Sequence, residues 1–429
     1  MPEAPAAPSR RTPTTSRGQR MVERLLDAAG AVFLAHGYRG SSVSLLCRQA
    51  GVANGTFYQY FPDKDALLAQ LLARFQGLVL AELRRAAARG HDRRGRIEAV
   101  VAALHDLLRR EIGLLQLFRE AEPTAGAAAA SFHAELEAEL PRLLDLPGIA
   151  PALLARFVLG AVYFNVVSRG VWGLEHQPLP SLVQFVLHGM APPRADPACW
   201  TWAIGREPLL PPRPAAAPPA MDAASPPGGG EATRRRLLAA AEELFGTLGY
   251  HETTVARLTE AAGVGLGTFY LHFPGKQELL AELVHRTTRR LTALVAAAVD
   301  GVEHRLAQEV LALRAFLVFV GRHGRMYRVV QEAEFVSREI GAGYYLTLAR
   351  GYEQSLARAM ARGEVRSLDP LALGLALLGV GHFVGQDARG ASASPGSAPP
   401  VTATVALLMG GLLGPPRRPG PAIARGERG

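Results

Sequence analysis

The sequence predicts an all-α protein made of two tandem copies of one helical unit. Residues 37–72 align with residues 249–284 without a gap, and 18 of these 36 positions are identical. A repeat of this length indicates two homologous domains rather than a solenoid of short units. Apolar side chains recur at helical spacing in both copies, as in Val22, Leu25 and Leu26. No segment shows the alternation of apolar and polar residues that is typical of strands.

Bulk composition is typical of a globular protein of the reduced cytoplasm. The 429 residues exceed one ordinary hydrophobic core, and 48% of them are hydrophobic. The net charge of +9 favours a polyanionic partner such as nucleic acid, the alternative being a solvated arginine surface. Cys47 and Cys199 are too few for a zinc site or a disulfide framework. The apolar stretches 152–167 and 371–385 are too short to span a bilayer, so we expect buried helices and no membrane partner.

The first two helices of each copy have clear ends. The first helix stops at "HGY" or "LGY", where Gly37 and Gly249 can adopt the left-handed cap conformation. Short second helices are predicted at 43–50 and 255–262. Their N-caps are hydroxyl side chains, offered by Ser41, Ser42, Thr253 and Thr254.

A glycine turn and a third short helix follow in each copy. Gly51 and Gly263 end the second helices, and "ANGTFYQYF" predicts a third helix of about two turns. Two short helices joined by such a turn form a helix-turn-helix, here at about 42–61 and 254–273. In this motif the second helix enters the major groove of DNA.

The third helix has an apolar face and a polar face. Phe57 and Phe61 are four residues apart and should face the first helix as core. Threonine and tyrosine hydroxyls are left outward and can donate to phosphate oxygens, whereas Asn54 and Gln59 can bond base edges. The alternative is that the aromatic residues only pack a small domain. The outward side chains are polar and the motif occurs twice, which favours DNA binding over this alternative.

The only two lysines of the chain, Lys64 and Lys276, follow the third helix at equivalent positions. Pro62 and Pro274 predict that a fourth helix begins there, capped by Asp63 in the first copy. A lysine in the first turn opposes the helix dipole. A DNA phosphate would supply a reason for it, and the alternative is a solvent-facing side chain.

The segments 19–79 and 231–291 resemble the N-terminal DNA-binding domain of the TetR family of transcriptional regulators. The resemblance rests on the long first helix ending in "GY", the "SSV" or "TTV" step, and "AGV-x-x-GTFY-x-x-F-P-x-K-x-x-LL". It implies three helices carrying the helix-turn-helix, followed by a larger helical ligand-binding and dimerisation domain, here at 80–193 and 292–416. It also implies a sequence-specific regulator, most often a repressor that leaves its palindromic operator when a small molecule binds.

The resemblance assigns DNA contacts residue by residue. In the first copy the implied phosphate contacts are Thr56, Tyr58, Tyr60 and Lys64. The implied base contacts are Asn54, Gly55 and Gln59, with Ser42 and Ser44 close to the groove. In the second copy the phosphate set is Thr268, Tyr270, His272 and Lys276. The base set is Leu266, Gly267 and Leu271, with Thr254 and Arg257 nearby.

Two departures from the family pattern stand out. Family members usually carry one such domain per chain, and this chain carries two. Leu266 and Leu271 replace Asn54 and Gln59, and a leucine cannot hydrogen-bond a base edge. Residues 17–77 hold seven cations against four acids, whereas 229–289 hold seven of each. These differences predict that the second copy binds DNA weakly, or binds it only because it is tethered to the first copy.

The two copies are joined by a proline-rich linker at 194–228. Within it, "CWTWAIG" (199–205) is aromatic enough to pack back on the first copy, and the tail from 417 looks unstructured. We expect the apolar closing helices of both copies to form one seam, giving an intramolecular pseudo-dimer. The rival arrangement is a homodimer with only the first copy on DNA.

The sequence says less about ligands. Polar residues amid the apolar helical halves are candidates for an effector pocket, namely Glu120, Tyr163, Asn165, Glu332, Tyr344 and His382. Their surroundings favour a small hydrophobic effector, the alternative being satisfied core groups. No metal-ligand spacing, phosphate loop or nucleophile motif points to an enzyme, a cofactor or a metal site. The alternative function is a helical sensor or interaction protein whose second copy no longer reads DNA.

Overall fold

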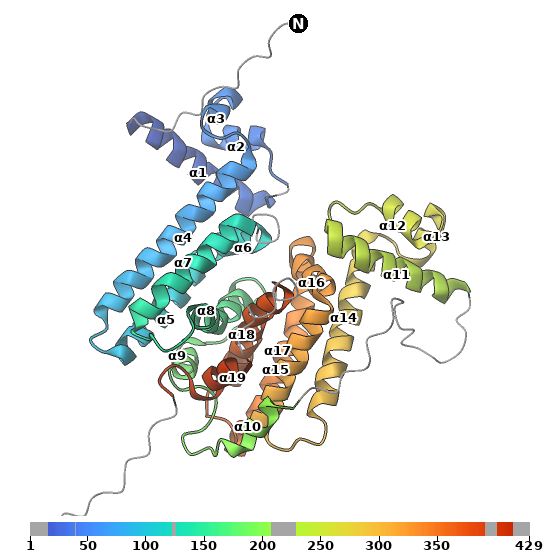
Figure 1. The fold of residues 1–429 in the computed structure, drawn as a ribbon. Coiled ribbons are helices and arrows are strands. Elements are labelled where there is room, and N and C mark those ends of the chain that lie inside the picture. The colour runs from blue at the N-terminus through green and yellow to red at the C-terminus, as the bar shows by residue number, and fades with distance from the viewer. Residues whose placement is uncertain (1–15, 39, 122–125, 207–228, 391–400, 415–429) are drawn as a thin grey trace, which may run out of the picture. The chain divides into compact units, whose positions relative to one another are not determined.

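The computed structural model describes residues 16–38, 40–121, 126–206, 229–390 and 401–414, and every regular element within them is a helix (Figure 1). The predicted all-α fold is therefore confirmed. The chain divides into two compact units, residues 1–155 and 156–429, and the division falls inside one helix. Residues 1–15, most of the linker and the C-terminal tail lie outside the described residues.

The first unit contains the first helix-turn-helix, five longer helices and the start of a sixth. Its helices are α1 (Ser16–His36), α2 (Val43–Ala50), α3 (Asn54–Tyr60), α4 (Lys64–Arg89), α5 (Arg93–Arg110), α6 (Ile112–Ala121), α7 (Gly126–Leu144) and the first turn of α8 (Pro151–Gly170). Helix α4 packs on α1 at one end and on α5 and α7 along its length. Leucines that are fully buried along α4, such as Leu67, Leu71 and Leu83, form the centre of this core.

The second unit contains the rest of α8 and every later helix. These are α9 (Leu179–His188), α10 (Ala198–Ile204), α11 (Gly229–Leu248), α12 (Val255–Ala262), α13 (Leu266–His272), α14 (Lys276–Val299), α15 (Arg305–Arg322), α16 (Gly324–Val336), α17 (Arg338–Ala361), α18 (Pro370–Gly390) and α19 (Val401–Gly410). Helices α11–α18 repeat the order of α1–α8, and α16, α17 and α18 pack in sequence beside α14 and α15.

The predicted helix ends are confirmed at atomic detail. Gly37 and Gly249 have φ of 71° and 89°, the left-handed region that glycine adopts without strain. The hydroxyl oxygens of Ser42 and Thr254 accept hydrogen bonds from the amides three residues later, which caps α2 and α12. Because these caps are local, the same short sequence signals end the helices in both copies.

The closing helices of the first repeat pack with those of the second repeat inside the second unit. Helix α8 crosses α18 at Gly160 and Gly379, where a Cβ on Gly160 would lie 2.7 Å from the Cα of Val380. Backbone hydrogen bonds join the ends of α9 and α19 in two reciprocal pairs. In the first pair, Met190 N donates to Leu408 O (2.8 Å) and Leu412 N donates to Val186 O (2.8 Å). In the second pair, Ala191 N donates to Met409 O (3.1 Å) and Leu413 N donates to Leu187 O (3.0 Å). We call these contacts the seam.

Helix α10, formed by the aromatic "CWTWAIG" segment, does not pack where the sequence suggested. It lies against α15 and α19 of the second repeat rather than on the first repeat. Trp200 and Ala203 are buried there, and the Arg314 guanidinium donates a hydrogen bond to the carbonyl oxygen of Ile204. The segment therefore ties the start of the linker to the second copy.

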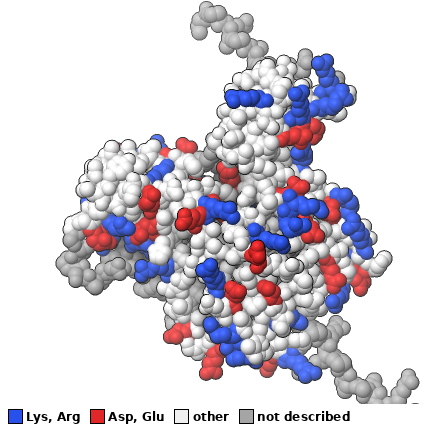
Figure 2. All heavy atoms as spheres, turned by 180° about the vertical axis from the view of Figure 1, so that it is seen from behind, with Lys and Arg blue, Asp and Glu red and all other residues white. Residues whose placement is uncertain are grey.

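Two described helices, α4 and α8, are long and apolar enough to cross a membrane by length and composition alone. Half of the apolar window of α4 and most of that of α8 are buried in the protein. This burial is what core helices show, so neither helix indicates a membrane. Figure 2 shows Lys and Arg side chains mixed with Asp and Glu over the face that it presents.

Candidate functional site

Each recognition helix is held by two buried phenylalanines. Phe57 and Phe61 of the first copy are 0% and 4% exposed, with ring centroids 5.7 Å apart. Phe269 and Phe273 of the second copy are 0% and 2% exposed. The rings fix one face of α3 and of α13 to the rest of the head, so the opposite face points to solvent. We call residues 16–61 and 229–273 the first and second heads.

The first head presents a polar surface formed by α2 and α3. The side chains predicted to reach DNA are exposed or half-buried there, namely Ser42, Ser44, Asn54, Thr56, Tyr58, Gln59 and Tyr60. The Asn54 amide donates to the hydroxyl oxygen of Ser44 at 3.3 Å, so the two helices present one continuous surface. A Cβ on Gly55 would meet no protein atom within 4 Å. The glycine is therefore not required by packing and leaves room for an external partner.

The second head presents the equivalent surface with different chemistry. Thr254, Arg257, Gly267 and Tyr270 are exposed, and Thr268 and His272 are half-buried. Leu266 and Leu271 are 54% and 84% exposed at the positions of Asn54 and Gln59. A Cβ on Gly267 would also meet no protein atom within 4 Å. The second head therefore keeps hydroxyl residues at the positions of Ser42, Thr56 and Tyr58, has His272 at that of Tyr60, and replaces the two amides by apolar side chains.

The two lysines hold the loop between the first and second helices of each head. Lys64 Nζ donates to the carbonyl oxygens of Tyr38 and Ser41, both at 3.2 Å. Lys276 Nζ donates to those of Tyr250 and Thr253, at 2.7 and 2.8 Å.

Each ammonium also lies over a tyrosine ring, 4.4 Å from the centroid of Tyr38 and 4.1 Å from that of Tyr250. Burial lowers the pKa of Lys276. These contacts explain, without invoking DNA, why a cation lies at the unfavourable end of the helix dipole. They also exclude the alternative of a solvent-facing lysine that makes no contacts. The phosphate role stays a prediction.

Two glutamates that were predicted to line a ligand pocket lie one at the base of each head. The Glu120 carboxylate on α6 accepts a hydrogen bond from the Tyr38 amide at 3.4 Å, and Glu332 on α16 accepts one from the Tyr250 amide at 3.0 Å. In each copy, the backbone amide after the left-handed glycine therefore donates to a glutamate of the helical domain that follows the head. The motif "REAE" of the first copy recurs as "QEAE" in the second at the same offset as "GY", so the glutamate and the amide occupy equivalent positions in both copies.

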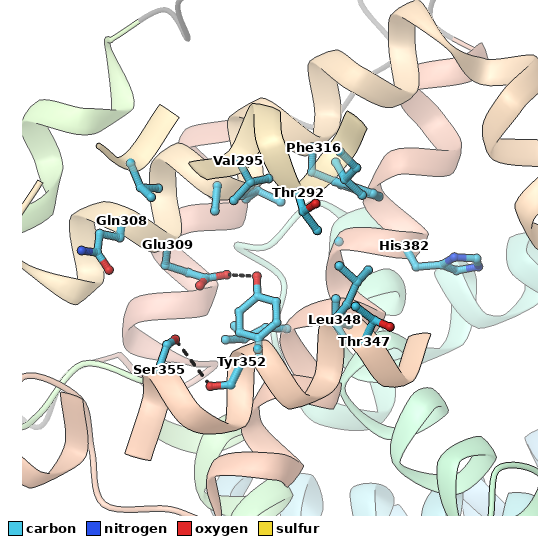
Figure 3. A pocket seen from close by; sticks show the side chains of 18 of the residues that line it. Thr292, Val295, Gln308, Glu309, Phe316, Thr347, Leu348, Tyr352, Ser355 and His382 are labelled. Carbon is cyan, nitrogen blue, oxygen red and sulfur yellow. Dashed lines mark hydrogen bonds between the residues drawn. The ribbon is translucent and has the colours of Figure 1, made fainter. Parts of the chain in front are cut away.

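A cavity of about 360 Å³ lies in the second repeat, between α14, α15, α17 and α18 (Figure 3). Its lining is mostly apolar, and Phe164 of α8 also lines it. Two of the predicted pocket residues, Tyr344 and His382, belong to this lining. Burial raises the pKa of Tyr344 well above its ordinary value, so the phenol stays neutral.

One end of the cavity carries a polar cluster that the sequence did not reveal. Arg305 and Glu309 are 6% and 3% exposed and form an ion pair of 2.8 Å. The Tyr352 hydroxyl donates to the other Glu309 oxygen at 3.1 Å, and Figure 3 shows this pair well apart from His382. The i, i+4 spacing of Arg305 and Glu309 on an apolar helix was the available signal.

The other predicted pocket residues do not line this cavity. Asn165 is fully buried, and its amide donates to the carbonyl oxygens of Ala161 and Ala372, both at 3.1 Å. It is a satisfied core group that joins α8 to α18. Tyr163 is also buried and stacks on the His382 ring at 6.2 Å. Within the residues that the structure describes, no group of three or more His, Cys, Asp and Glu could hold a metal ion.

Comparisons with known proteins agree with this geometry. The family model described as "Bacterial regulatory proteins, tetR family" matches residues 25–71 and 237–283, which include both helix-turn-helix motifs. The HTH-type transcriptional regulator UidR of Escherichia coli K12 is 24% identical over 150 residues, which cover 33% of this chain and 76% of UidR. The HTH-type transcriptional repressor KstR of Mycobacterium tuberculosis is 33% identical over 109 residues, which cover 25% of this chain and 50% of KstR.

Among solved structures, GusR of Salmonella enterica matches 41% of this chain over 95% of its own length, with 19% identity and a TM-score of 0.36. With two matches to the family model, each on a helix-turn-helix whose recognition helix is exposed, the chain belongs to the TetR family of DNA-binding transcriptional regulators and carries two tandem TetR-like repeats.

Proposed function

We propose that a single chain acts as a pseudo-dimeric, ligand-responsive repressor that reads an asymmetric operator with two different heads. The observation that carries this proposal is the reciprocity of the seam. In a two-fold interface, each contact between residues i and j is matched by a contact between their equivalents. Gly189 and Gly411, both with φ of 66°, are the equivalent residues that end α9 and α19, and the hydrogen bonds around them obey this rule.

Because the seam pairs the two repeats of one chain, no second chain is needed to form this two-fold interface. Arg366 of the second repeat adds hydrogen bonds to the carbonyl oxygens of His188, Gly189 and Ala191, so the end of α9 is bound by side chain as well as backbone. Tethering also raises the effective concentration of one head near the DNA that the other has bound. Two different heads then suit two different half-sites.

The domain assignment in this proposal follows the sequence. The DNA-binding domains are 19–79 and 231–291, the ligand and dimerisation halves are 80–193 and 292–416, and the linker is 194–228. The protein acts in the cytoplasm on operator DNA, and its heads contact phosphates and bases through the residues assigned to them by the resemblance.

The cavity of the second repeat is the proposed effector site. Its apolar lining favours a small hydrophobic ligand, and the Arg305–Glu309–Tyr352 cluster offers one polar end. Phe164 and Leu408, which belong to the seam helices α8 and α19, line the cavity as well. A ligand there contacts the elements that pair the repeats, which supports regulation through the seam.

Light scattering and footprinting test the proposal together. We expect one chain of 45.7 kDa free and one chain on each operator, protecting two half-sites of different sequence. Affinity should fall steeply between two salt concentrations, because bound phosphates release counterions. A two-chain complex protecting one palindrome would reject the pseudo-dimer. Failure to bind any fragment of its own promoter region would favour the sensor alternative.

A further inference from the structure

We propose that the second head selects its half-site through thymine methyl groups, with Leu266 and Leu271 as the specificity-determining residues. This inference rests on the proposed function, because it requires both heads to contact one operator. It assigns to the second head a readout that differs in kind from that of the first head.

The exposure of these leucines is the primary observation. Leu271 is 84% exposed, the highest value among the large apolar side chains of the described residues, and Leu266 is 54% exposed. Both project from a helix whose other face is anchored by Phe269. Side chains that are this exposed contribute little to the packing of the head itself.

The neighbours of the leucines indicate that the occupant is DNA. Thr268 and Tyr270 occupy the positions of Thr56 and Tyr58, and Tyr270 is 54% exposed where Tyr58 is 53%. The hydroxyl residues that can hold a phosphate backbone are therefore kept around an altered centre. The apolar pair is continuous with the surface that carries DNA contacts in the family.

Major-groove chemistry then specifies the base. A leucine side chain cannot donate to or accept from a base edge, and among the four bases only thymine presents a methyl group in the major groove. Asn54 and Gln59 of the first head favour adenine by bidentate hydrogen bonds. The two half-sites should differ accordingly, with thymine methyls facing the second head.

The charges of the two heads also support different modes of base readout. Residues 229–289 hold seven cations and seven acids, whereas 17–77 hold seven cations and four acids. The second head therefore gains less from phosphate attraction, and burial of a methyl group is a contribution that salt does not screen.

Deoxyuridine substitution tests the inference directly, because uracil differs from thymine only by the lost methyl group. We first define the operator by selection from random DNA and by footprinting, then replace each thymine of the second half-site singly by uracil. We expect one or two positions at which the dissociation constant rises about fourfold, the amount expected for one buried methyl group. Leu271→Ala or Leu266→Ala should remove the penalty at its own position.

Controls separate this inference from the proposed function. The Gln59→Ala variant should leave the uracil penalties of the second half-site unchanged. Both leucines are exposed, so the alanine variants are expected to fold, and their circular dichroism checks this. Two protected half-sites with no uracil penalty would overturn the methyl readout and leave the pseudo-dimer intact. A footprint in which the second head protects no DNA would overturn both.

Discussion

The two heads share their helix caps, loop contacts and buried phenylalanines, which we call the frame. They differ in the side chains that project from this frame into solvent. Ser42 and Thr254 cap equivalent helices, and Lys64 and Lys276 donate to equivalent pairs of loop carbonyl oxygens. The exposed positions 54 and 59 are amides in the first head, whereas their equivalents are leucines in the second. The positions that the fold needs are therefore alike in both copies, and the positions that face a partner differ.

The buried phenylalanines show why the frame is so uniform. Each turn, cap and ring contact satisfies a backbone group or fills a site within a domain of about 45 residues, and a domain this small has little energy to spare. An exposed side chain has no such constraint. Equivalent residues that differ between the heads therefore point to what each head binds, rather than to how each head folds.

The largest effect should come from breaking the seam, because the comparison matters for DNA only if both heads act together. A Cβ on Gly379 would overlap the carbonyl oxygen of Gly160. Gly379→Ala should force α8 and α18 apart and lower the free energy of unfolding by about 3 kcal/mol, the upper range for overpacking a core. Urea denaturation measures the loss, and operator affinity should fall with it.

Gly381→Ala is the matched control for that substitution. Gly381 lies in the same helix, and its nearest neighbour to an added Cβ is a Phe316 ring carbon at 3.7 Å, an ordinary contact. The control should be as stable as the natural chain or slightly more so. Equal losses in both variants would show that α18 is intolerant of alanine in general and would remove support from the close crossing.

Loss of either lysine should weaken its own head by a smaller amount. Lys276→Met leaves two loop carbonyls without their ammonium donor, and we expect a cost of about 2 kcal/mol. Lys64→Met should cost less, since its bonds are 3.2 Å long rather than 2.7–2.8 Å. Hydrogen exchange of the loop amides in each head measures the local stability.

The same variants decide the predicted phosphate role. A lysine that neutralises one phosphate contributes about 0.9 to the slope of log affinity against log salt concentration. If the slope of the Lys64→Met variant equals that of the natural chain, the phosphate contact is absent and the lysine serves the frame alone.

The glutamate contacts at the base of each head should have effects of about 1 kcal/mol. Glu332→Gln weakens the acceptor of the Tyr250 amide at 3.0 Å, and Glu120→Gln weakens that of the Tyr38 amide at 3.4 Å. Thermal unfolding should therefore show the larger loss for Glu332→Gln. Glu353→Gln, an exposed change in the middle of α17, should leave stability unchanged. The reverse order would mean that hydrogen-bond length does not govern this contact.

Sequence reasoning succeeded where the causes were local. The limits of α2 and α12 at 43–50 and 255–262 follow from hydroxyl caps and glycines only a few residues away. It missed contacts between distant segments. Lys276 meets residues 23 and 26 positions away, Glu332 reaches across 82, and Asn165 bonds a carbonyl 207 residues later. No periodicity or cap encodes such pairings, because they depend on how complete helices pack.

The smallest effect is a change of opposite sign in stability and in DNA binding, and it tests most directly how close each head stands to the groove. Gly55 and Gly267 lie in the recognition helices with open space around them, and glycine costs a helix about 0.5–1 kcal/mol relative to alanine. Gly55→Ala and Gly267→Ala should each stabilise their head slightly and weaken operator binding, because the new methyl group stands where a base edge must approach. Gly77→Ala, in α4, also has open space and should give the stability gain without the loss of affinity. If Gly267→Ala binds DNA as tightly as the natural chain while Gly55→Ala does not, the second head stands farther from the groove than the first, and its leucines cannot reach the bases.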